Sequence, residues 1–423
     1  GMRRLLSAIL LLLGHSTASA APREKAALPS APDKVDFTAR LHGELMTKKG
    51  NLFYSPTSIR MAMAMAQAGA VGETADEMKK VLGLGDDPAA GIAKLRADWK
   101  ALADPQMPSW ATQSNDPQTQ KYAEAELERR RIVLRVVNRL WGQKGRTFNE
   151  AFLTNLTDRY GAPLETLDFK SAVEPSRVAI NKWVSDQTEK KIEELIPAGT
   201  IPADTKLVIT NAVYFKGQWS KQFETQATRP EAFHAPDGSK QVPMMHQLDR
   251  FRVARIDNGL MLEMPYGEGA LAMDIVLPTA RDGLAEVEKR FAAGAFDGWL
   301  ARLEHRRVDV AMPSFKTKVS LELAKVLEAM GMKRAFKYPD ADFSGMDGTH
   351  ELFISKVMHQ AFVAVDEKGT EAAAATAVMM EAGAARPTDE PVKFRADHPF
   401  MVVIRDTRNG EALFVGRILD PKS

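Results

Sequence analysis

Residues 367–387 read EKGTEAAAATAVMMEAGAARP, a stretch in which local helix preference and side-chain alternation disagree. Alanine is the strongest helix former, so the alanines favour a helix. Every second residue from Thr370 to Ala382, however, is uncharged and small or apolar, whereas Glu371 and Glu381 fall in the other row. That period of two is typical of a strand that buries one face. The stretch therefore predicts a segment that can change between an exposed conformation and a strand.

The sequence on both sides of this stretch predicts a chain rich in strands. Apolar runs with strand character lie at 133–140, 207–215, 261–265, 271–277, 308–311, 353–365, 400–404 and 413–418. Asn409-Gly410 separates the last two runs, and Asn-Gly between apolar runs is typical of a hairpin. Gly267 and Gly269 likewise favour a turn rather than a dinucleotide-binding loop, because an apolar strand pattern follows them.

Three local signals predict helices. Ser55-Pro56 combines an N-cap with proline at the first helical position, so a helix should run from there to about residue 69. Thr74 and Glu77 have the spacing of a capping box that opens a second helix. Ser320 is expected to open a third helix.

Composition allows a large core and excludes several functions. Hydrophobic residues make up 44% of the 423 positions, and 57 basic residues nearly cancel 55 acidic ones. The balance gives no global field for nucleic acid or an anionic membrane.

There is no cysteine, which excludes thiol catalysis, disulfides and cysteine-bound metals. The eight histidines are scattered, and the sequence contains no P-loop, G-x-S-x-G or H-E-x-x-H motif. We expect neither a metal nor a cofactor.

The first 20 residues are expected to be a secretory signal peptide. Arg3-Arg4 precede an apolar run at 5–13, and Ala18-Ser-Ala20 resembles a cleavage site. Gly1 before Met2 is expected to be left over from cloning. Residues 21–34, rich in Ala, Pro and charge, should form a loose N-terminus. Cleavage would give a secreted or periplasmic protein with no membrane association.

Five blocks of the sequence resemble the serpin family in the expected order. They are 51–59 (NLFYSPTSI), 72–83 (GETADEMKKVLG), 211–219 (NAVYFKGQW), 355–376 (SKVMHQAFVAVDEKGTEAAAAT) and 394–400 (FRADHPF). The resemblance runs from about residue 35 to Pro421. It implies an α+β serpin fold in one domain over 35–423, with three β-sheets, about eight or nine helices and an exposed reactive-centre loop at about 367–391.

The resemblance also implies roles for named residues. The proximal hinge, which enters the central sheet first, would comprise Glu367, Gly369, Thr370, Glu371, Ala372, Ala373, Ala374, Ala375 and Thr376. The shutter beneath that sheet would contain Ser55, Ser58, Asn211 and His359. Without the family, His359 would be interpreted as a hydrogen-bonded core histidine, and the two interpretations are compatible. Trp219 would lie at the breach, where the loop enters.

The reactive bond is expected between Gly383 and Ala384, counting from the hinge as in typical inhibitors. The loop is slightly longer than usual, so the bond could instead involve Met380, Glu381, Ala382, Ala385 or Arg386. Pro387 follows Arg386 and disfavours cleavage there by a trypsin-like enzyme. The neighbouring small and apolar residues favour elastase-like or subtilisin-like serine proteases.

The function implied by the resemblance is inhibition of a serine protease by suicide-substrate trapping. The protein would not be an enzyme, would act as a monomer, and would form a covalent acyl complex with its target. A cysteine protease is a second class of target. The alternative function is that of a non-inhibitory serpin, which carries a small apolar ligand or acts as a chaperone.

One basic run raises the question of a polyanion partner. Some serpins bind glycosaminoglycans through basic helices near Glu128-Arg129-Arg130-Arg131. Glu124, Glu126 and Glu128 neutralise this run, which favours a solvated helix face. Residues 104–121, with several prolines and polar residues, predict a polar loop or insertion just before it.

Overall fold

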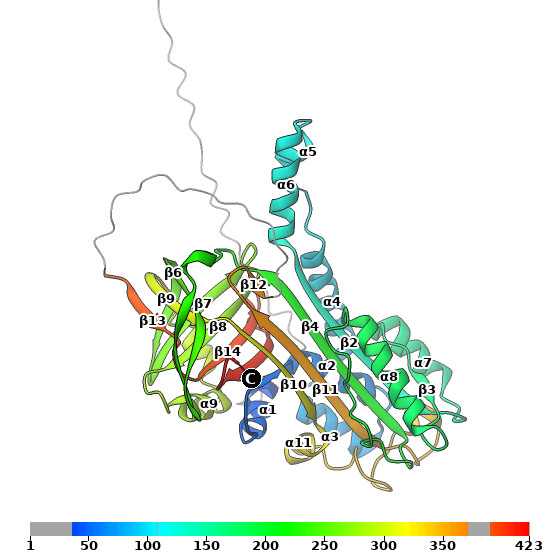
Figure 1. Cartoon of the computed structure of the whole chain (residues 1–423). Helices are drawn as coiled ribbons and strands as arrows, with labels where there is room; N and C mark the ends of the chain where they lie inside the picture. The colour runs from blue at the N-terminus through cyan, green and yellow to red at the C-terminus, as the bar shows by residue number, and fades with distance from the viewer. Residues whose placement is uncertain (1–35, 108, 371–389, 423) are drawn as a thin grey trace, which may run out of the picture.

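The computed structural model describes residues 36–107, 109–370 and 390–422 (Figure 1). The expected signal peptide and loose N-terminus therefore lie outside the described residues. So do hinge positions Glu371–Thr376 and all the candidate reactive-bond positions. None of the described helices is long and apolar enough to cross a membrane.

A six-stranded sheet runs through the centre of the described structure (Figure 1). Its strand order is β10 (Phe315–Glu322), β11 (Ile354–Val365), β12 (Gly369–Thr370), β4 (Leu207–Gln218), β2 (Ile132–Gln143) and β3 (Glu165–Leu167). β11 and β4 also pair directly and in parallel along most of their length. Eleven of the twelve β4 residues are buried, which explains its continuous apolar run. Such runs are typical of strands covered on both faces.

A nine-stranded sheet forms the second layer. Its main strand order is β1 (Leu52–Tyr54), β15 (Ala412–Ile418), β14 (Phe400–Asp406), β8 (Leu271–Pro278), β7 (Gly259–Tyr266), β6 (Gly238–Ile256), β9 (Glu304–Pro313) and β13 (Val392–Arg395), and β5 (Arg229–Ala235) pairs with β6. The 19-residue strand β6 pairs with β5 in its first half and with β7 in its second half. Because β6 joins these strands into a single sheet, the described residues form two sheets where three were expected. The α+β fold class is confirmed.

Twelve α-helices lie in the part of the chain that the structure describes. Nine have six residues or more: α1 (Phe37–Leu45), α2 (Pro56–Gln67), α3 (Gly72–Leu82), α4 (Pro88–Ala103), α6 (Pro117–Arg130), α7 (Glu150–Asn155), α8 (Val173–Gln187), α9 (Leu284–Ala292) and α11 (Ala324–Ala329). The short ones are α5 (Ser109–Thr112), α10 (Phe296–Leu300) and α12 (Ser344–Asp347). A π-helical turn, η1 (Leu156–Tyr160), follows α7, and a 3-10 turn, η2 (Thr225–Ala227), precedes β5.

Helix α2 lies in the core and begins as predicted. The Ser55 hydroxyl accepts a hydrogen bond from the Ser58 amide at 3.2 Å, and Pro56 occupies the first turn. Every residue from Pro56 to Ala66 is buried. On the opposite face of the six-stranded sheet, α8 packs Ile180 and Val184 into a smaller apolar cluster. The sheet is therefore covered on both sides.

Three local predictions were wrong. The capping box is not formed, because helix α3 begins at Gly72 and the Glu77 carboxylate accepts hydrogen bonds from the Lys333 and Arg334 amides instead. Ser320 lies inside strand β10 and pairs with Gln360, so the following helix begins only at Ala324. Residues 104–121, expected to be a polar loop or insertion, contain α5 and the first turn of α6, so the loop was wrong, whereas the insertion stays a prediction.

Candidate functional site

The site lies where β11 and β4 diverge at one end of the six-stranded sheet (Figure 1). The two strands pair in parallel from Ile354–Leu207 to Phe362–Tyr214. Beyond that point, the two-residue strand β12 lies between them and pairs antiparallel with both. Gly369 is opposite Gln218, and Thr370 is opposite Gly217 on β4 and Val365 on β11. The two residues of β12 therefore occupy the space between the diverging ends of β11 and β4.

Gly369 is required by this arrangement. Its φ of 151° is rarely adopted by residues with a side chain. A Cβ atom there would meet the Gly217 carbonyl oxygen and would lie 2.7 Å from the Gln218 Cα and 2.9 Å from the Trp219 nitrogen. These are backbone atoms, which cannot move aside as a flexible side chain can. Only glycine therefore fits where β12 enters the sheet.

Thr370 is fully buried, with its hydroxyl 2.8 Å from the Tyr266 hydroxyl. Trp219, also fully buried, stacks on the Tyr266 ring with 4.4 Å between centroids. The Trp219 indole donates a hydrogen bond to the Asp366 carbonyl at 3.0 Å, and its amide donates to the Lys368 carbonyl at 2.8 Å. Trp219 and Tyr266 therefore hold the chain that leads into β12.

A tight turn at residues 366–369 connects β11 to β12. The Asp366 carboxylate accepts hydrogen bonds from the Lys368 amide at 2.9 Å and the Gly369 amide at 3.2 Å. Burial raises the pKa of this carboxyl group above its ordinary value. Glu367 lies on the outer side of the turn, where its carboxylate accepts a hydrogen bond from the Thr228 hydroxyl at 2.7 Å. The turn is thus held by side chains on both sides.

A buried polar cluster lies further down the β11–β4 pair. His359 and Asn211 are register partners, and the His359 Nδ1 atom is hydrogen-bonded to the Asn211 side-chain oxygen. The Asn211 side-chain nitrogen donates to the Ser58 hydroxyl and, at 3.2 Å, to the Ser58 carbonyl. The Ser55 amide donates to His359 Nε2 at 3.2 Å. The structure therefore brings together all four residues expected in the shutter.

The hydrogen bonds define the protonation state of His359. Nε2 accepts from a backbone amide, so it carries no proton, and Nδ1 is the protonated nitrogen. A second proton on Nε2 would point at the Ser55 N–H donor. Burial lowers the pKa of His359 to about 3, which agrees with a neutral imidazole. The cluster is consequently uncharged at neutral pH.

Two members of the site were not identified from the sequence. Asn138 of β2 accepts a hydrogen bond from the Asn211 side chain, which extends the polar cluster to a third strand. Tyr266 of β7 contacts both Trp219 and Thr370. Neither residue lies in one of the quoted motifs. An isolated asparagine in the apolar run 132–141 was the one available signal.

The basic run at the end of α6 is paired as its sequence indicated. Glu126 forms ion pairs with Arg129 at 2.7 Å and with Arg130 at 3.1 Å, and Glu128 pairs with Arg131 at 3.4 Å. The described residues contain no group of three His, Asp or Glu side chains that could hold a metal ion.

The described structure thus combines a six-stranded sheet whose central strands part around β12 with a buried polar cluster between the same two strands. The family described as "Serpin (serine protease inhibitor)" matches residues 33–421. The chain belongs to the serpin family. It is therefore a member of a family of protease inhibitors and not an enzyme.

Relatives with similar sequences and structures cover nearly all of the chain. An uncharacterized serpin-like protein from Thermococcus kodakarensis is 40% identical over 91% of this chain and 84% of its own length. A leukocyte elastase inhibitor from Xenopus laevis is 36% identical over 88% and 93%, respectively. The crystal structure of Serpin48, a highly specific serpin of the insect Tenebrio molitor, has a TM-score of 0.75 at 28% identity and covers 91% of this chain and 96% of that one.

Proposed function

We propose that this serpin inhibits serine proteases by suicide-substrate trapping. The protease serine attacks the carbonyl carbon of the reactive bond, the amine of the next residue departs with a proton, and an ester links loop and enzyme. The freed end of the loop then inserts between β11 and β4 as a full strand, carrying the enzyme with it. The inhibitor supplies the conformational change, and the protease supplies the chemistry.

The observation that carries this proposal is the position of β12. Thr370 already pairs with both neighbouring strands, and Gly369 pairs with β4. A strand that continues β12 would be antiparallel to β11 and to β4. It would replace their direct parallel pairing with two antiparallel ladders, which are slightly more stable per residue.

Insertion also requires the direct pairing between β11 and β4 to be broken. The parallel register from Ile354 to Phe362 must separate, and the hydrogen bond between His359 and Asn211 spans that boundary. Asn211 keeps partners on its own side in Ser58 and Asn138, so the cluster can remain largely satisfied when the strands part. This arrangement supports a shutter role for the cluster.

The reactive bond and the target enzyme are inferred from the sequence. We place the bond between Gly383 and Ala384, within the range Met380–Arg386, in residues that the structure does not describe. Small and apolar neighbours suit elastase-like or subtilisin-like enzymes, and the similarity to a leukocyte elastase inhibitor supports the first class. We further propose that the protein is exported and acts as a monomer.

Incubation with elastase, subtilisin and trypsin, followed by denaturing gels and mass spectrometry, tests this function. Trapping predicts a complex that survives denaturation and a released C-terminal fragment that begins at Ala384. Loop cleavage without a complex, for these and for a wider panel that includes cysteine proteases, would favour the non-inhibitory carrier or chaperone function.

A further inference from the structure

Helices α5 and α6 form a hairpin, residues 109–130, that projects from the end of the six-stranded sheet where β12 enters (Figure 1). Helix α6 leads into β2, whose first residue, Ile132, is opposite Gly217 of β4. Gly217 is in turn opposite Thr370 of β12. The base of the hairpin therefore lies at the same end of the sheet as the strand-entry site.

The base of the hairpin is held against the turn that follows Tyr266. Arg129 donates a hydrogen bond to the Gly267 carbonyl at 3.4 Å, and Arg130 forms an ion pair with Glu268 at 3.2 Å. Helix α6 has 14 residues. Its axis is therefore about 21 Å long. Figure 1 shows α5 and the first part of α6 standing clear of the other labelled elements.

Two aromatic side chains are in contact on the outer part of this hairpin. The ring centroids of Trp110 in α5 and Tyr122 in α6 are 5.8 Å apart. The two residues are 45% and 47% exposed, and Trp110 is the most exposed of the six tryptophans, all of which are described. Exposed Trp and Tyr side chains are the ones that most often dominate the binding energy of a protein interface.

The hairpin holds the aromatic pair in a defined position. Ala111 of α5 and Ala123 of α6 are fully buried. The Gln120 side chain donates a hydrogen bond to the Ala111 carbonyl at 2.8 Å, and Asp116 caps α6 by accepting one from the Thr119 amide at 2.8 Å. A surface that is ordered before binding loses less conformational entropy when a partner binds.

The surface around the aromatic pair is nearly uncharged. Asp116 is the only charged residue in 109–120, and its carboxylate is occupied in the helix cap. Lys121 and Glu124, which follow, have opposite charges. A polyanion would need a cluster of cations, which this part of the hairpin lacks. The pair therefore suits a neutral, partly apolar protein surface.

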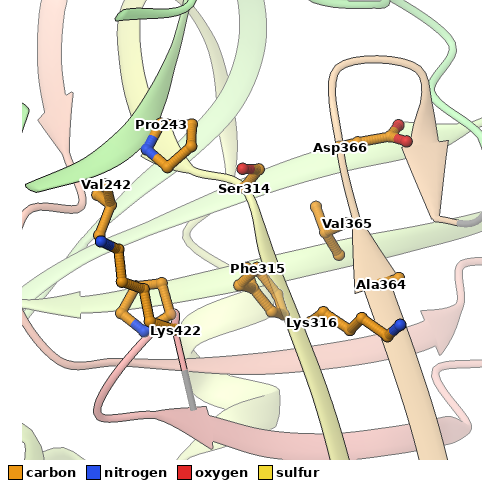
Figure 2. Close-up of a pocket in the computed structure, with 10 residues that line it drawn as sticks. Val242, Pro243, Ser314, Phe315, Lys316, Ala364, Val365, Asp366 and Lys422 are labelled. Carbon is orange, nitrogen blue, oxygen red and sulfur yellow. The ribbon is translucent and has the colours of Figure 1, made fainter. Parts of the chain in front are cut away.

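A cavity of about 320 Å³ beside the turn between β11 and β12 is a second feature near the strand-entry site (Figure 2). Its apolar lining residues include Val242, Phe315 and Val365, all of which are buried. Figure 2 shows these side chains, with Asp366 in the turn beyond Val365. Because buried side chains present no surface to a large partner, the hairpin is the stronger candidate for contact with a protein.

The position of the hairpin favours the attacking protease as that partner. The described chain stops at Thr370 and resumes at Glu390, just before β13. Met380, the first candidate position for the reactive bond, is ten residues from Thr370 and hence at most about 35 Å away. A protease domain of roughly 230 residues has a radius of gyration of about 17 Å and is about 45 Å across. An enzyme bound at the reactive bond is therefore large enough to contact the hairpin.

We propose that Trp110 and Tyr122 form an exosite, a surface outside the reactive-centre loop, which docks the protease as it attacks the loop. The two rings pack against apolar and amide groups of the enzyme and retain it in the encounter complex, so attack becomes faster. The proposal rests on the proposed function only in requiring that a protease attacks the loop. It holds whether the attack ends in trapping or in simple cleavage.

The rate of attack on the loop tests the exosite. Second-order rates, counted as trapped complex plus cleaved protein, are measured with elastase, subtilisin and trypsin. We expect the Trp110→Ser/Tyr122→Ser variant to be attacked about tenfold more slowly than the parent by the enzyme that attacks the parent fastest. The fraction of attacks that ends in a complex should not change. The difference should persist at high salt, because salt screens charges and not apolar contacts.

Two further double variants are controls. Val71→Ser/Tyr338→Ser removes two apolar side chains that are 41% and 65% exposed, next to α3 and α11 at the opposite end of the described structure (Figure 1). This variant should be attacked at the parental rate. Trp110→Phe/Tyr122→Phe keeps two aromatic rings and should keep most of that rate. The unfolding midpoint of each variant shows whether a slower attack reflects a loss of fold.

Several results would overturn the exosite. One is an equal rate for the parent and the serine variant of the hairpin with every enzyme, and another is equal slowing in the Val71/Tyr338 control. A parent dimer in sedimentation velocity that dissociates in the serine variant would assign the aromatic pair to a second copy of the chain. Slower attack on the serine variant, without any trapped complex from the parent, would support the exosite and contradict the proposed inhibition.

Discussion

His359 of β11 and Asn211 of β4 are opposite one another across a parallel strand pair and are joined by a side-chain hydrogen bond. This bond crosses the line along which the sheet must open if a strand is to enter. The proposed function therefore places a specific, buried polar contact on the path of insertion.

The Thr370→Arg variant should be cleaved as a substrate without trapping the protease. Thr370 is fully buried beside Tyr266, and burying an unpaired guanidinium there would cost several kcal/mol. We expect the yield of denaturation-resistant complex to fall about tenfold or more. Thr47→Arg, the same change at an exposed helix end, should trap normally. Normal complex yield from Thr370→Arg would contradict the account of β12.

The Gly369→Ala variant should lose the start of the inserted strand. The added methyl group would collide with the backbone of β4, so β12 must leave its position. Gly348→Ala provides the control, because Gly348 also has a positive φ, of 76°, but has open space around its Cβ position. Both variants should lose roughly 1–2 kcal/mol to backbone strain, and only Gly369→Ala should reduce trapping. Equal trapping by the two variants would argue against a requirement for close approach.

Acid should weaken the native state through His359. Its folded-state pKa of about 3 lies below the value of about 6.5 expected in the unfolded chain, so only the unfolded chain takes up this proton between the two values. The unfolding free energy should therefore fall as pH decreases from about 6.5 toward 3, by up to about 1.4 kcal/mol per pH unit from this residue. Denaturant titrations at a series of pH values should show that the unfolding free energy of His359→Gln depends less steeply on pH than that of the parent. Identical slopes for parent and variant would place the charge change elsewhere.

A Gly383→Phe variant should change the choice of protease without affecting loop insertion. A large apolar side chain before the reactive bond suits enzymes with deep apolar pockets and disfavours those with small ones. Inhibition rates across a protease panel, with mass spectrometry of the cleaved loop, provide the measurement. An unchanged preference would move the reactive bond to another position within Met380–Arg386.

The sequence predicted those features that depend on neighbouring residues. Ser55-Pro56 begins a helix, and Asn409-Gly410 turns the chain between β14 and β15, because the cap and the turn form locally. Ser320 and Thr74 were misassigned because distant partners determine their structure. Ser320 lies in a strand because it pairs with Gln360 of β11. The Thr74 hydroxyl accepts a hydrogen bond from the Asp342 amide instead of capping α3.

The same distinction applies to the site. Ser55, Ser58, Asn211 and His359 were grouped through the family resemblance, and the structure places them in contact. Asn138 and Tyr266 could not be found in this way, because their roles depend on the register of β2 against β4 and on the approach of β7 to Trp219. The functional roles of the hinge, shutter and breach residues stay predictions until insertion is measured.

Thermal unfolding of the intact and the loop-cleaved protein tests the central claim most directly. If the cleaved loop enters between β11 and β4, several new hydrogen bonds, each worth about 1 kcal/mol, should raise the unfolding midpoint by about 10 °C or more. Thr370→Arg, cleaved at the same bond, should show little or no rise. A parent protein whose midpoint is unchanged or lower after cleavage would contradict strand insertion.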